Sequence, residues 1–257
     1  MTQFGDSDLT RNDFLGGRVR LWQPRAGYRA GVDPVLLAAA VPAATGHTVL
    51  ELGCGAGAAI LCLQARVPGT QAVGVEVQAA YADLARRNAA ENAAPLEVVE
   101  ADLSALPAQL KQRQFDHVIA NPPYYRAGAH SPATDHGRRL AQGEDTPLDR
   151  WFDTAAKRLA PRGYLHMIQK ADRLPDMLSA CAGRVGSVEV LPLSPRVGRK
   201  AELVILRARK DGRAGFQLHA PLIMHAGDRH EKDGDSYTTQ LSGVLRDGAA
   251  ICDAFDQ

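Results

Sequence analysis

The sequence has little of what marks secreted, membrane-spanning or metal-binding proteins. Its 257 residues include four cysteines, which form neither a C-x-x-C pair nor a disulfide framework, as is usual in a reducing cytoplasm. The longest apolar run, 35–41, ends at Pro42 and is too short to cross a bilayer, and the polar, acidic residues 1–12 do not resemble a signal peptide. The eight histidines form no metal-ligand pattern. We therefore expect a cytoplasmic protein with no membrane segment and no bound metal.

The sequence also lacks an excess of charge of either sign. Lysine and arginine together number 30 against 29 acidic residues, so the net charge is +1 and no long-range field would steer a charged partner. A nucleic-acid partner would have to be held by local basic clusters. Arginine makes up 24 of the 30 basic residues, which suits phosphate and base contacts, although a GC-rich genome produces the same bias. Apolar residues make up 45% of the chain, which is enough for a full core.

From residue 48 onward, short strand-like apolar runs alternate with helical patterns. This alternation predicts βαβ units and an α/β fold with a doubly wound, mostly parallel, seven-stranded sheet of the Rossmann-like type. The last two strands are joined by a short polar connection, so we expect them to pair antiparallel. The expected strands are 49–52, 72–77, 96–99, 115–120, 163–168, 188–191 and 202–207, and the expected helices include 78–92, 148–159 and 173–182.

The segments outside this alternation divide the chain into four parts. We expect a disordered or flexible N-terminus at 1–13, an extension of a strand or hairpin plus one helix at 14–47, the main domain at 48–210, and a C-terminal appendage at 211–257. A loop rich in Gly, Pro, Asp and His at 126–147 interrupts the main domain. Loops of this length are usually functional or disordered.

The first strand ends in a glycine loop that opens a helix. Gly53, Gly55 and Gly57 allow tight turns and close approach of a ligand to the backbone, and a helix N-terminus favours negative charge. Glu76, at the end of the second strand, is at the right distance along the chain to accept hydrogen bonds from ribose hydroxyls. The same glycines with Ala58 also satisfy the dinucleotide pattern G-x-G-x-x-G/A. The pattern predicts a nucleoside site, does not decide between NAD and another nucleoside, and leaves a tight structural turn as the alternative.

The fourth strand is followed by Asn121-Pro122-Pro123-Tyr124. Together with Glu51 and the glycine loop, this motif resembles the class I S-adenosylmethionine-dependent methyltransferases that act on planar amino groups. The resemblance implies an enzyme whose cofactor is S-adenosylmethionine. It implies that the Asn121 side-chain oxygen and the Pro122 carbonyl accept the two N–H bonds of the target amine, which prepares it for in-line attack without a strong base. Pro123 would stiffen the turn and Tyr124 would stack on a flipped base.

The same resemblance implies a set of cofactor contacts. The three glycines would pass beside the methionyl and ribose parts, and Glu76 would hold the ribose hydroxyls. Asp102, just after the third strand, would accept the adenine amino group and Leu103 would supply its backbone N–H; the alternative for Asp102 is a helix N-cap. Arg29 and Asp33 match the positions expected to close over the methionine end. The full expected set is Arg29, Asp33, Glu51, Gly53, Gly55, Gly57, Glu76, Asp102, Leu103 and Asn121.

Residues 23–39 narrow the resemblance further. This segment resembles the part that precedes the fold in the bacterial tRNA adenine-N6 methyltransferases that modify the adenosine beside the anticodon of a valine tRNA. The likeness covers roughly 14–207, with a looser echo at 220–239. It implies N6-methylation of an adenosine in tRNA, with RNA as the partner. The longer loop after Arg126 and the charged tail after Lys210 depart from the better-known members and leave the RNA target and the oligomeric state open.

Other functions stay open. Glutamine-N5 methyltransferases of peptide release factors also carry Asn-Pro-Pro-Tyr, because a glutamine amide is an equally poor nucleophile, but they typically have a sizeable helical domain in front. Another RNA, such as rRNA, would be served by the same chemistry. A fold retained only to bind RNA would not need the intact motif at 121–124. DNA adenine methyltransferases fit less well, because no base-reading domain is evident.

The basic residues that would hold RNA form local clusters. Between Phe14 and Val32 there is no acidic residue, and arginines alternate with Trp22 and Tyr28, a pattern that suits base stacking and phosphate contact. An edge strand with a solvated basic face is the alternative. The RNA-binding candidates are Arg18, Arg20 and Arg25 in this segment, Arg126, Arg138 and Arg139 in the long loop, and Arg196, Arg199 and Lys200 before the last strand.

Overall fold

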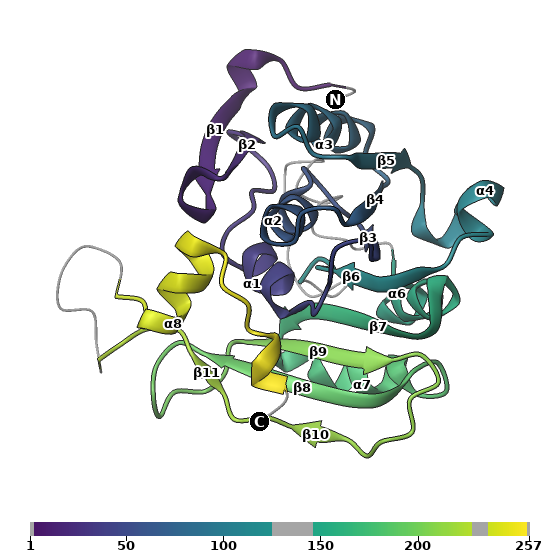
Figure 1. Cartoon of the computed structure of the whole chain (residues 1–257), viewed down its shortest axis with the longest axis vertical. Helices are drawn as coiled ribbons and strands as arrows, with labels where there is room; N and C mark the ends of the chain where they lie inside the picture. The colour runs from purple at the N-terminus through teal and green to yellow at the C-terminus, as the bar shows by residue number, and fades with distance from the viewer. Residues whose placement is uncertain (1–2, 125–145, 228–235, 256–257) are drawn as a thin grey trace, which may run out of the picture.

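One central sheet organises the computed structural model, which describes residues 3–124, 146–227 and 236–255 (Figure 1). The strand order is β10-β8-β9-β7-β6-β3-β4-β5, and β11 also pairs with β8. The strands are β3 (Thr48–Leu52), β4 (Gln71–Glu76), β5 (Leu96–Glu100), β6 (Phe115–Ala120), β7 (Leu159–Lys170), β8 (Gly186–Ser194), β9 (Leu203–Arg209), β10 (Gln217–Leu218) and β11 (Leu222–Ile223).

The expected α/β class and mostly parallel sheet are confirmed. Strands β3 to β7 run parallel to one another. The antiparallel pairing expected for the last two core strands is also confirmed, since β9 runs antiparallel to both β7 and β8. Over the part of the chain that the structure describes, the sheet has nine strands and not seven, because the two-residue strands β10 and β11 add to the outer edge of β8.

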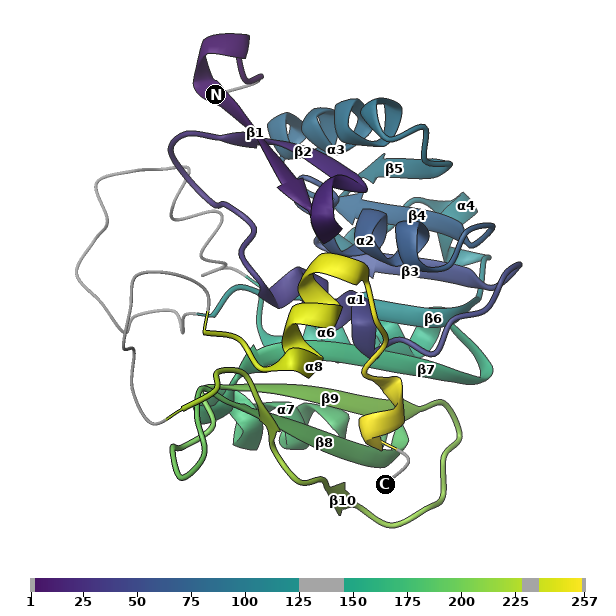
Figure 2. The same ribbon diagram turned by 60° about the vertical axis from the view of Figure 1, so that its left-hand side comes forward.

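Helices cover both faces of the sheet because side chains alternate along each strand. In β3, Val49 packs into the cluster that includes the helices α1 and α2, whereas Leu50 and Leu52 pack into the cluster on the opposite face, with α6 and α7. Figure 2 shows these layers from a second side. The helices are α1 (Asp33–Ala40), α2 (Ala58–Arg66), α3 (Ala79–Glu91), α4 (Ala108–Lys111), α6 (Leu148–Arg158), α7 (Leu174–Cys181) and α8 (Thr239–Ser242).

The N-terminal residues form a hairpin, so the expectation of a flexible tail over 1–13 is wrong for most of that range. After a 3-10 turn, η1 (Asp6–Asp8), strand β1 (Leu9–Phe14) pairs antiparallel with β2 (Val19–Pro24) at all six positions. Two side-chain amides, one in α3 and one at its C-cap, then make the hydrogen bonds to β2 that a neighbouring strand would make. Asn88 accepts from the Trp22 N–H at 2.8 Å and donates to its carbonyl at 3.0 Å, and Asn92 does the same with Arg20 at 2.8 Å each.

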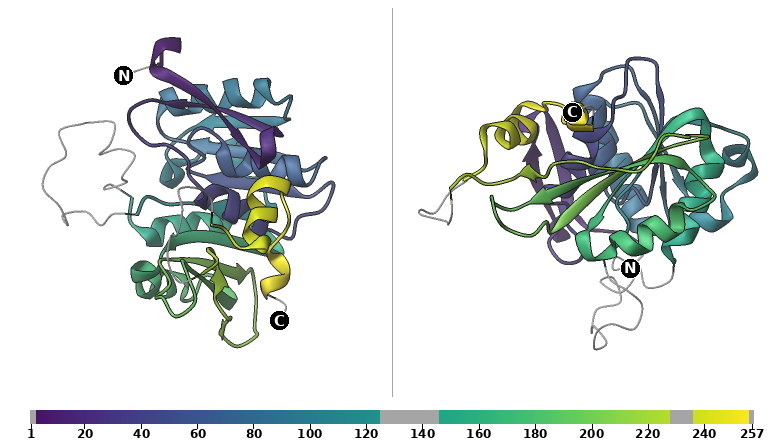
Figure 3. Two further views of the ribbon diagram at one scale, coloured as in Figure 1. Left: turned by 90° about the vertical axis from the view of Figure 1, so that its left-hand side faces the viewer. Right: turned by 90° about the horizontal axis from the view of Figure 1, so that it is seen from below.

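The C-terminal residues are part of the core, although the sequence suggests an appendage over 211–257. Leu241 of α8 and Val244 of the π-helical turn η5 (Gly243–Asp247) are buried against the α1 side of the sheet. The N–H of Ile251 donates to the Ala39 carbonyl at 2.9 Å. Figure 3 shows this segment beside the N-terminal hairpin. Across the three described ranges, no helix is both long and apolar enough to span a bilayer.

Candidate cofactor and substrate site

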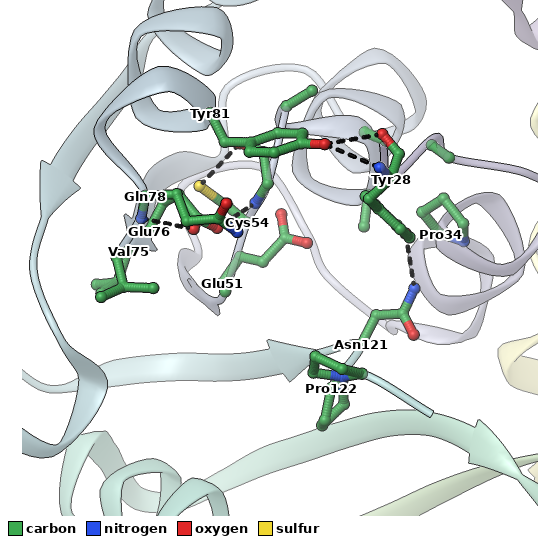
Figure 4. A pocket seen from close by; sticks show the side chains of 18 of the residues that line it. Tyr28, Pro34, Glu51, Cys54, Val75, Glu76, Gln78, Tyr81, Asn121 and Pro122 are labelled. Carbon is green, nitrogen blue, oxygen red and sulfur yellow. Dashed lines mark hydrogen bonds between the residues drawn. The ribbon is translucent and has the colours of Figure 1, made fainter. Parts of the chain in front are cut away.

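A cavity of about 480 Å³ opens at the carboxyl ends of β3, β4 and β6 (Figure 4). Its lining includes Gly53 and Gly55 of the glycine loop, Glu51, Glu76 and all four residues of the 121–124 turn, whereas Gly57 is not one of the lining residues. β3 lies between β4 and β6 in the sheet, so the chain's direction of winding reverses at this point. Ligands of doubly wound sheets bind at such a reversal, and the structure brings the two predicted motifs together there.

The glycine loop adopts backbone angles that favour glycine. Gly53, Gly55 and Gly57 have φ values of +65°, +53° and +85°, in the left-handed region. Gly57 is the N-cap of α2. A Cβ atom at Gly53 would lie 2.6 Å from Cη2 of Trp151, so this position also has no room for a side chain. Gly53 and Gly55, which line the cavity, therefore present backbone without side chains to it, as a closely bound nucleoside requires.

Two buried carboxylates face the cavity from adjacent strands. Glu76 accepts hydrogen bonds from the N–H groups of Gly55 at 2.8 Å and Gln78 at 2.9 Å, which fixes its carboxylate beside the loop. Glu51 accepts from the Ile60 N–H at 3.1 Å. Burial raises the pKa of both acids, and that of Glu51 rises well above its usual range.

The glycine pattern fits both NAD and S-adenosylmethionine, and the charged groups of the cavity favour one of them. Among its lining residues, all of them described, four carry a carboxyl group and Arg29 is the one that carries a basic side chain. The acids are Asp33, Glu51, Glu76 and Asp102. In their ionised form these acids would repel a pyrophosphate and attract a sulfonium or an ammonium group, and a bound cation would itself lower the raised pKa values of Glu51 and Glu76. The residues present fit S-adenosylmethionine.

The Asn121–Tyr124 turn is tied to the segment before α1. The Asn121 side-chain nitrogen donates to the Tyr28 hydroxyl at 3.5 Å, and the Tyr124 hydroxyl donates to the Asp33 carboxylate. Burial raises the pKa of Asp33 and of Tyr124. Tyr28 is itself held by the Tyr81 hydroxyl, which accepts from its N–H at 3.0 Å and donates to its carbonyl at 3.1 Å. Hydrogen bonds thus connect the Asn121–Tyr124 turn with the segment before α1, and both line the same cavity.

Arg29 and Asp33 both line the cavity, and each is hydrogen-bonded to other protein groups. The Arg29 guanidinium donates to the Thr10 hydroxyl, the Pro24 carbonyl and the Asn12 side chain at 2.7–2.9 Å. It therefore braces the hairpin, and its contact with the methionine end stays a prediction.

Asp102 shows the capping role that the sequence leaves as the alternative. Its Oδ1 accepts from both the N–H and the hydroxyl of Ser104 at 2.7 Å, at the start of the 3-10 turn η3 (Leu103–Ala105). Asp102 and Leu103 nevertheless line the cavity, so the cap and a contact with adenine are compatible. The adenine contact stays a prediction.

The basic residues predicted to contact RNA fall into three groups. Arg18, Arg20, Arg25, Arg199 and Lys200 are exposed. Arg126, Arg138 and Arg139 lie outside the described residues, as does nearly all of the predicted loop at 126–147.

Arg196 forms the third group, and for this residue the prediction of RNA contact is wrong. It is 9% exposed, and its guanidinium donates to the carbonyls of Ala226 and Gly227 and to the Ser236 hydroxyl. These bonds connect the end of β8 with the segment before α8. Since the charged group faces protein acceptors, we remove Arg196 from the RNA-binding candidates.

Sequence reasoning missed several side chains of the site. Tyr81 lines the cavity from α3 and Trp151 from α6, where the helical pattern marks them as ordinary core residues. Gln169, near the end of β7, donates to the carbonyls of the 121–124 turn. The only signal that the sequence offers for Gln169 is a polar residue directly after the apolar run 163–168. Among the described residues, no three His, Cys, Asp or Glu side chains gather to hold a metal ion.

The fold, the glycine loop and the acidic cavity together define a class I S-adenosylmethionine-dependent methyltransferase. The chain belongs to the methyltransferase small domain family, whose model matches residues 30–191. This assignment confirms the resemblance drawn from the motifs and the choice of S-adenosylmethionine as cofactor.

Curated relatives and solved structures agree with this family. The tRNA1(Val) (adenine(37)-N6)-methyltransferase of Cronobacter sakazakii is 33% identical over 213 residues, 74% of this chain and 84% of that protein. Its counterpart from Porphyromonas gingivalis W83 is 32% identical over 164 residues, 60% of this chain, and the match spans 64% of that relative's length.

Among solved structures, a predicted O-methyltransferase from Agrobacterium tumefaciens has a TM-score of 0.69 at 29% identity, covering 85% of this chain and 98% of that one. The 16S rRNA N2 G1207 methyltransferase of T. thermophilus, solved with AdoMet and guanosine, has a TM-score of 0.56 at 21% identity. That match covers 79% of this chain and 50% of the other, and it supports the fold.

Proposed function

We propose that the protein methylates the N6 amino group of an adenosine in tRNA, next to the anticodon, with S-adenosylmethionine as the methyl donor. The observation that carries this proposal is that the Asn121–Tyr124 turn lines the same cavity as Glu76, the carboxylate expected to bind the ribose of the cofactor. The donor and an exocyclic amine can therefore meet there without a conformational rearrangement of the sheet.

The turn supplies what a weakly nucleophilic amine needs. The lone pair of the adenine amine is delocalised into the ring, and it becomes available when both N–H bonds are held by acceptors. The bond from the Asn121 nitrogen to Tyr28 leaves the Asn121 oxygen as one such acceptor, and the carbonyl of Pro122 is the other. When bound, S-adenosylmethionine supplies a methyl group on a positively charged sulfur. No strong base is required, because the amine becomes acidic once it carries the methyl group.

The relatives and the surface support RNA as the substrate class. The curated relatives named above are tRNA1(Val) adenine(37)-N6-methyltransferases. Arg18 and Arg20 are exposed on the N-terminal hairpin, and Arg25 follows it directly. The segment that continues from this hairpin reaches the cavity at Tyr28, so the basic surface and the site are adjacent along the chain.

The test is methylation of tRNA purified from a strain that lacks this protein. The protein is incubated with that tRNA and isotopically labelled S-adenosylmethionine, and the tRNA is then digested for mass spectrometry of its nucleosides. We expect labelled N6-methyladenosine, which fragment analysis places beside the anticodon of one tRNA. The matched control is Asn121→Ala, which retains the cofactor cavity and lacks one acceptor.

Two results would contradict the proposal. If purified rRNA is labelled in a parallel assay and tRNA is not, the tRNA substrate is wrong although the methyl-transfer chemistry is retained. If a purified release factor gains methylglutamine in a parallel assay and both RNAs stay unlabelled, the turn acts on an amide substrate.

A further inference from the structure

Among the described residues, the carbonyl groups of the two prolines in the Asn121–Tyr124 turn receive no hydrogen bond from the backbone of the sheet. Pro122 and Pro123 have no N–H, and the pairing of β6 with β7 ends at Ala120 and Met167. β7 continues beyond that pair to Lys170, alongside the turn (Figure 1). Pro122 is buried, so its carbonyl needs a hydrogen-bond partner from a side chain.

Gln169 of β7 provides that partner for both prolines. Its side-chain nitrogen lies 3.1 Å from the Pro122 carbonyl oxygen and 3.3 Å from that of Pro123. Because the amide nitrogen carries two hydrogens, it can serve both carbonyls at once. The Gln169 side chain is fully buried, so water does not compete for these bonds.

The orientation of the Gln169 amide is set by a third bond. Its side-chain oxygen accepts from the N–H of Lys170 at 2.9 Å. The oxygen is therefore turned to a backbone donor and the nitrogen to the two carbonyls. A carboxylate or an apolar side chain of the same length could not make this set of contacts.

We propose that Gln169 is a positioning residue for methyl transfer, acting through the Pro122 carbonyl. A carbonyl oxygen has two lone pairs, and the Gln169 bond uses one of them. The second is then directed to the cavity that Pro122 lines, where the target amine would donate. Gln169 does not touch the amine; it sets where the acceptor points. This inference rests on the proposed role of the turn.

The first test compares Gln169→Leu with Gln64→Leu. Gln64 is a matched control because it too is buried and donates to two backbone carbonyls, those of Thr70 at 3.4 Å and Pro95 at 3.2 Å. Neither Gln64 nor its two partners line the cavity. We expect the single-turnover methylation rate of Gln169→Leu at saturating RNA to fall about 10- to 100-fold, since a displaced contact group costs this much. The affinity for S-adenosylhomocysteine should stay at the parental value in both variants.

A loss of rate in Gln169→Leu no larger than in Gln64→Leu would overturn the inference. Such a result would mean that replacing any buried glutamine of this fold lowers the methylation rate to the same extent, because it destabilises the protein. A loss of S-adenosylhomocysteine affinity that accounts for the whole fall in rate would also overturn it, because the residue would then shape the cofactor cavity instead.

The second test uses Gln169→Glu and its pH profile. A protonated glutamic acid at this position can donate to the Pro122 carbonyl, whereas the ionised form presents charge to two carbonyl oxygens. The rate of this variant relative to the parent should therefore fall as pH rises from about 6 to about 9. A ratio that does not change with pH would contradict donation to the carbonyl.

A third measurement separates failure of this inference from failure of the proposed function. In the parental protein, the side-chain NH2 protons of Gln169, assigned by their absence in Gln169→Leu, should exchange slowly with solvent in NMR spectra. Slow exchange together with no methylation of tRNA would refute the tRNA substrate and leave the contact in place. Fast exchange would overturn the positioning role whatever the substrate is.

Discussion

Replacing Gly53 with alanine tests whether the packing of Trp151, as well as the cofactor, shapes the glycine loop. Gly53 has a φ of +65°, and a side chain at this angle costs about 1–2 kcal/mol. Its Cβ would lie 2.6 Å from Cη2 and 3.0 Å from Cζ3 of the Trp151 ring. Trp151 is 6% exposed and its indole N–H donates to the Thr146 carbonyl at 3.2 Å, so the ring is held in place. Overpacking adds about 1–3 kcal/mol, and we expect a total loss of about 2–5 kcal/mol of unfolding free energy.

The comparison variant is Gly55→Ala. Gly55 has a similar φ of +53°, but the atom nearest to an added Cβ is Cε1 of Tyr28 at 3.8 Å, an ordinary contact. This variant should lose about 1–2 kcal/mol, from the backbone angle alone. Urea unfolding of the cofactor-free proteins measures both losses without the contribution of ligand binding. Equal losses in the two variants would refute the role of Trp151.

Three further predictions address catalysis, RNA binding and pH. Asn121→Ala should lower the single-turnover methylation rate on the order of 10² to 10³-fold with unchanged S-adenosylhomocysteine affinity, because the variant lacks one acceptor for the amine; a parental rate would contradict this. Neutralising Arg18, Arg20 and Arg25 should reduce the slope of log RNA affinity against log salt by about 0.7–0.9 for each phosphate group that the variant no longer binds, as measured by fluorescence anisotropy, and an unchanged slope would indicate a solvated face. Burial raises the pKa of Glu51 above its ordinary value of 4.5, so the folded state holds this proton more tightly and the group's contribution to stability is lost as pH rises above that value. Urea unfolding of cofactor-free Glu51→Gln should therefore show a smaller decrease in stability between about pH 5 and pH 8 than the parent, and an identical pH dependence would contradict the assignment.

Much of the fold was predictable because its signals are local. The apolar runs of β3, β4 and β6 and the helical period of α3 and α6 follow from side chains that alternate or recur at fixed spacing. The glycine loop and the motif at 121–124 were also readable, because each lies at the end of a buried strand. Parallel strands bring such ends to one edge of the sheet, and this is why two motifs about 65 residues apart predict a single site.

The errors arose where a segment is stabilised by distant partners. The polar residues 10–13 carry a weak strand signal, yet they form part of β1 because β2 pairs with them, and β2 itself is held by Asn88 of α3 and by Asn92 at the C-cap of α3. Arg196 belongs to a basic cluster in the sequence, but its guanidinium meets the carbonyls of Ala226 and Gly227. Charge and periodicity do not reveal which backbone groups of a remote segment lack a partner.

The sequence by itself determined the class of this protein, whereas the tertiary structure decided how its site is held together. Strand and helix periods, three glycines and an Asn-Pro-Pro-Tyr turn are properties of contiguous residues, so they predict a nucleoside cavity beside a turn that we propose to bind the target amine. The contacts of Tyr28 with Asn121, of Trp151 with Gly53 and of Gln169 with Pro122 join residues from different elements. Each depends on how two separately formed elements are placed against each other, and that placement exists only once the whole core has packed.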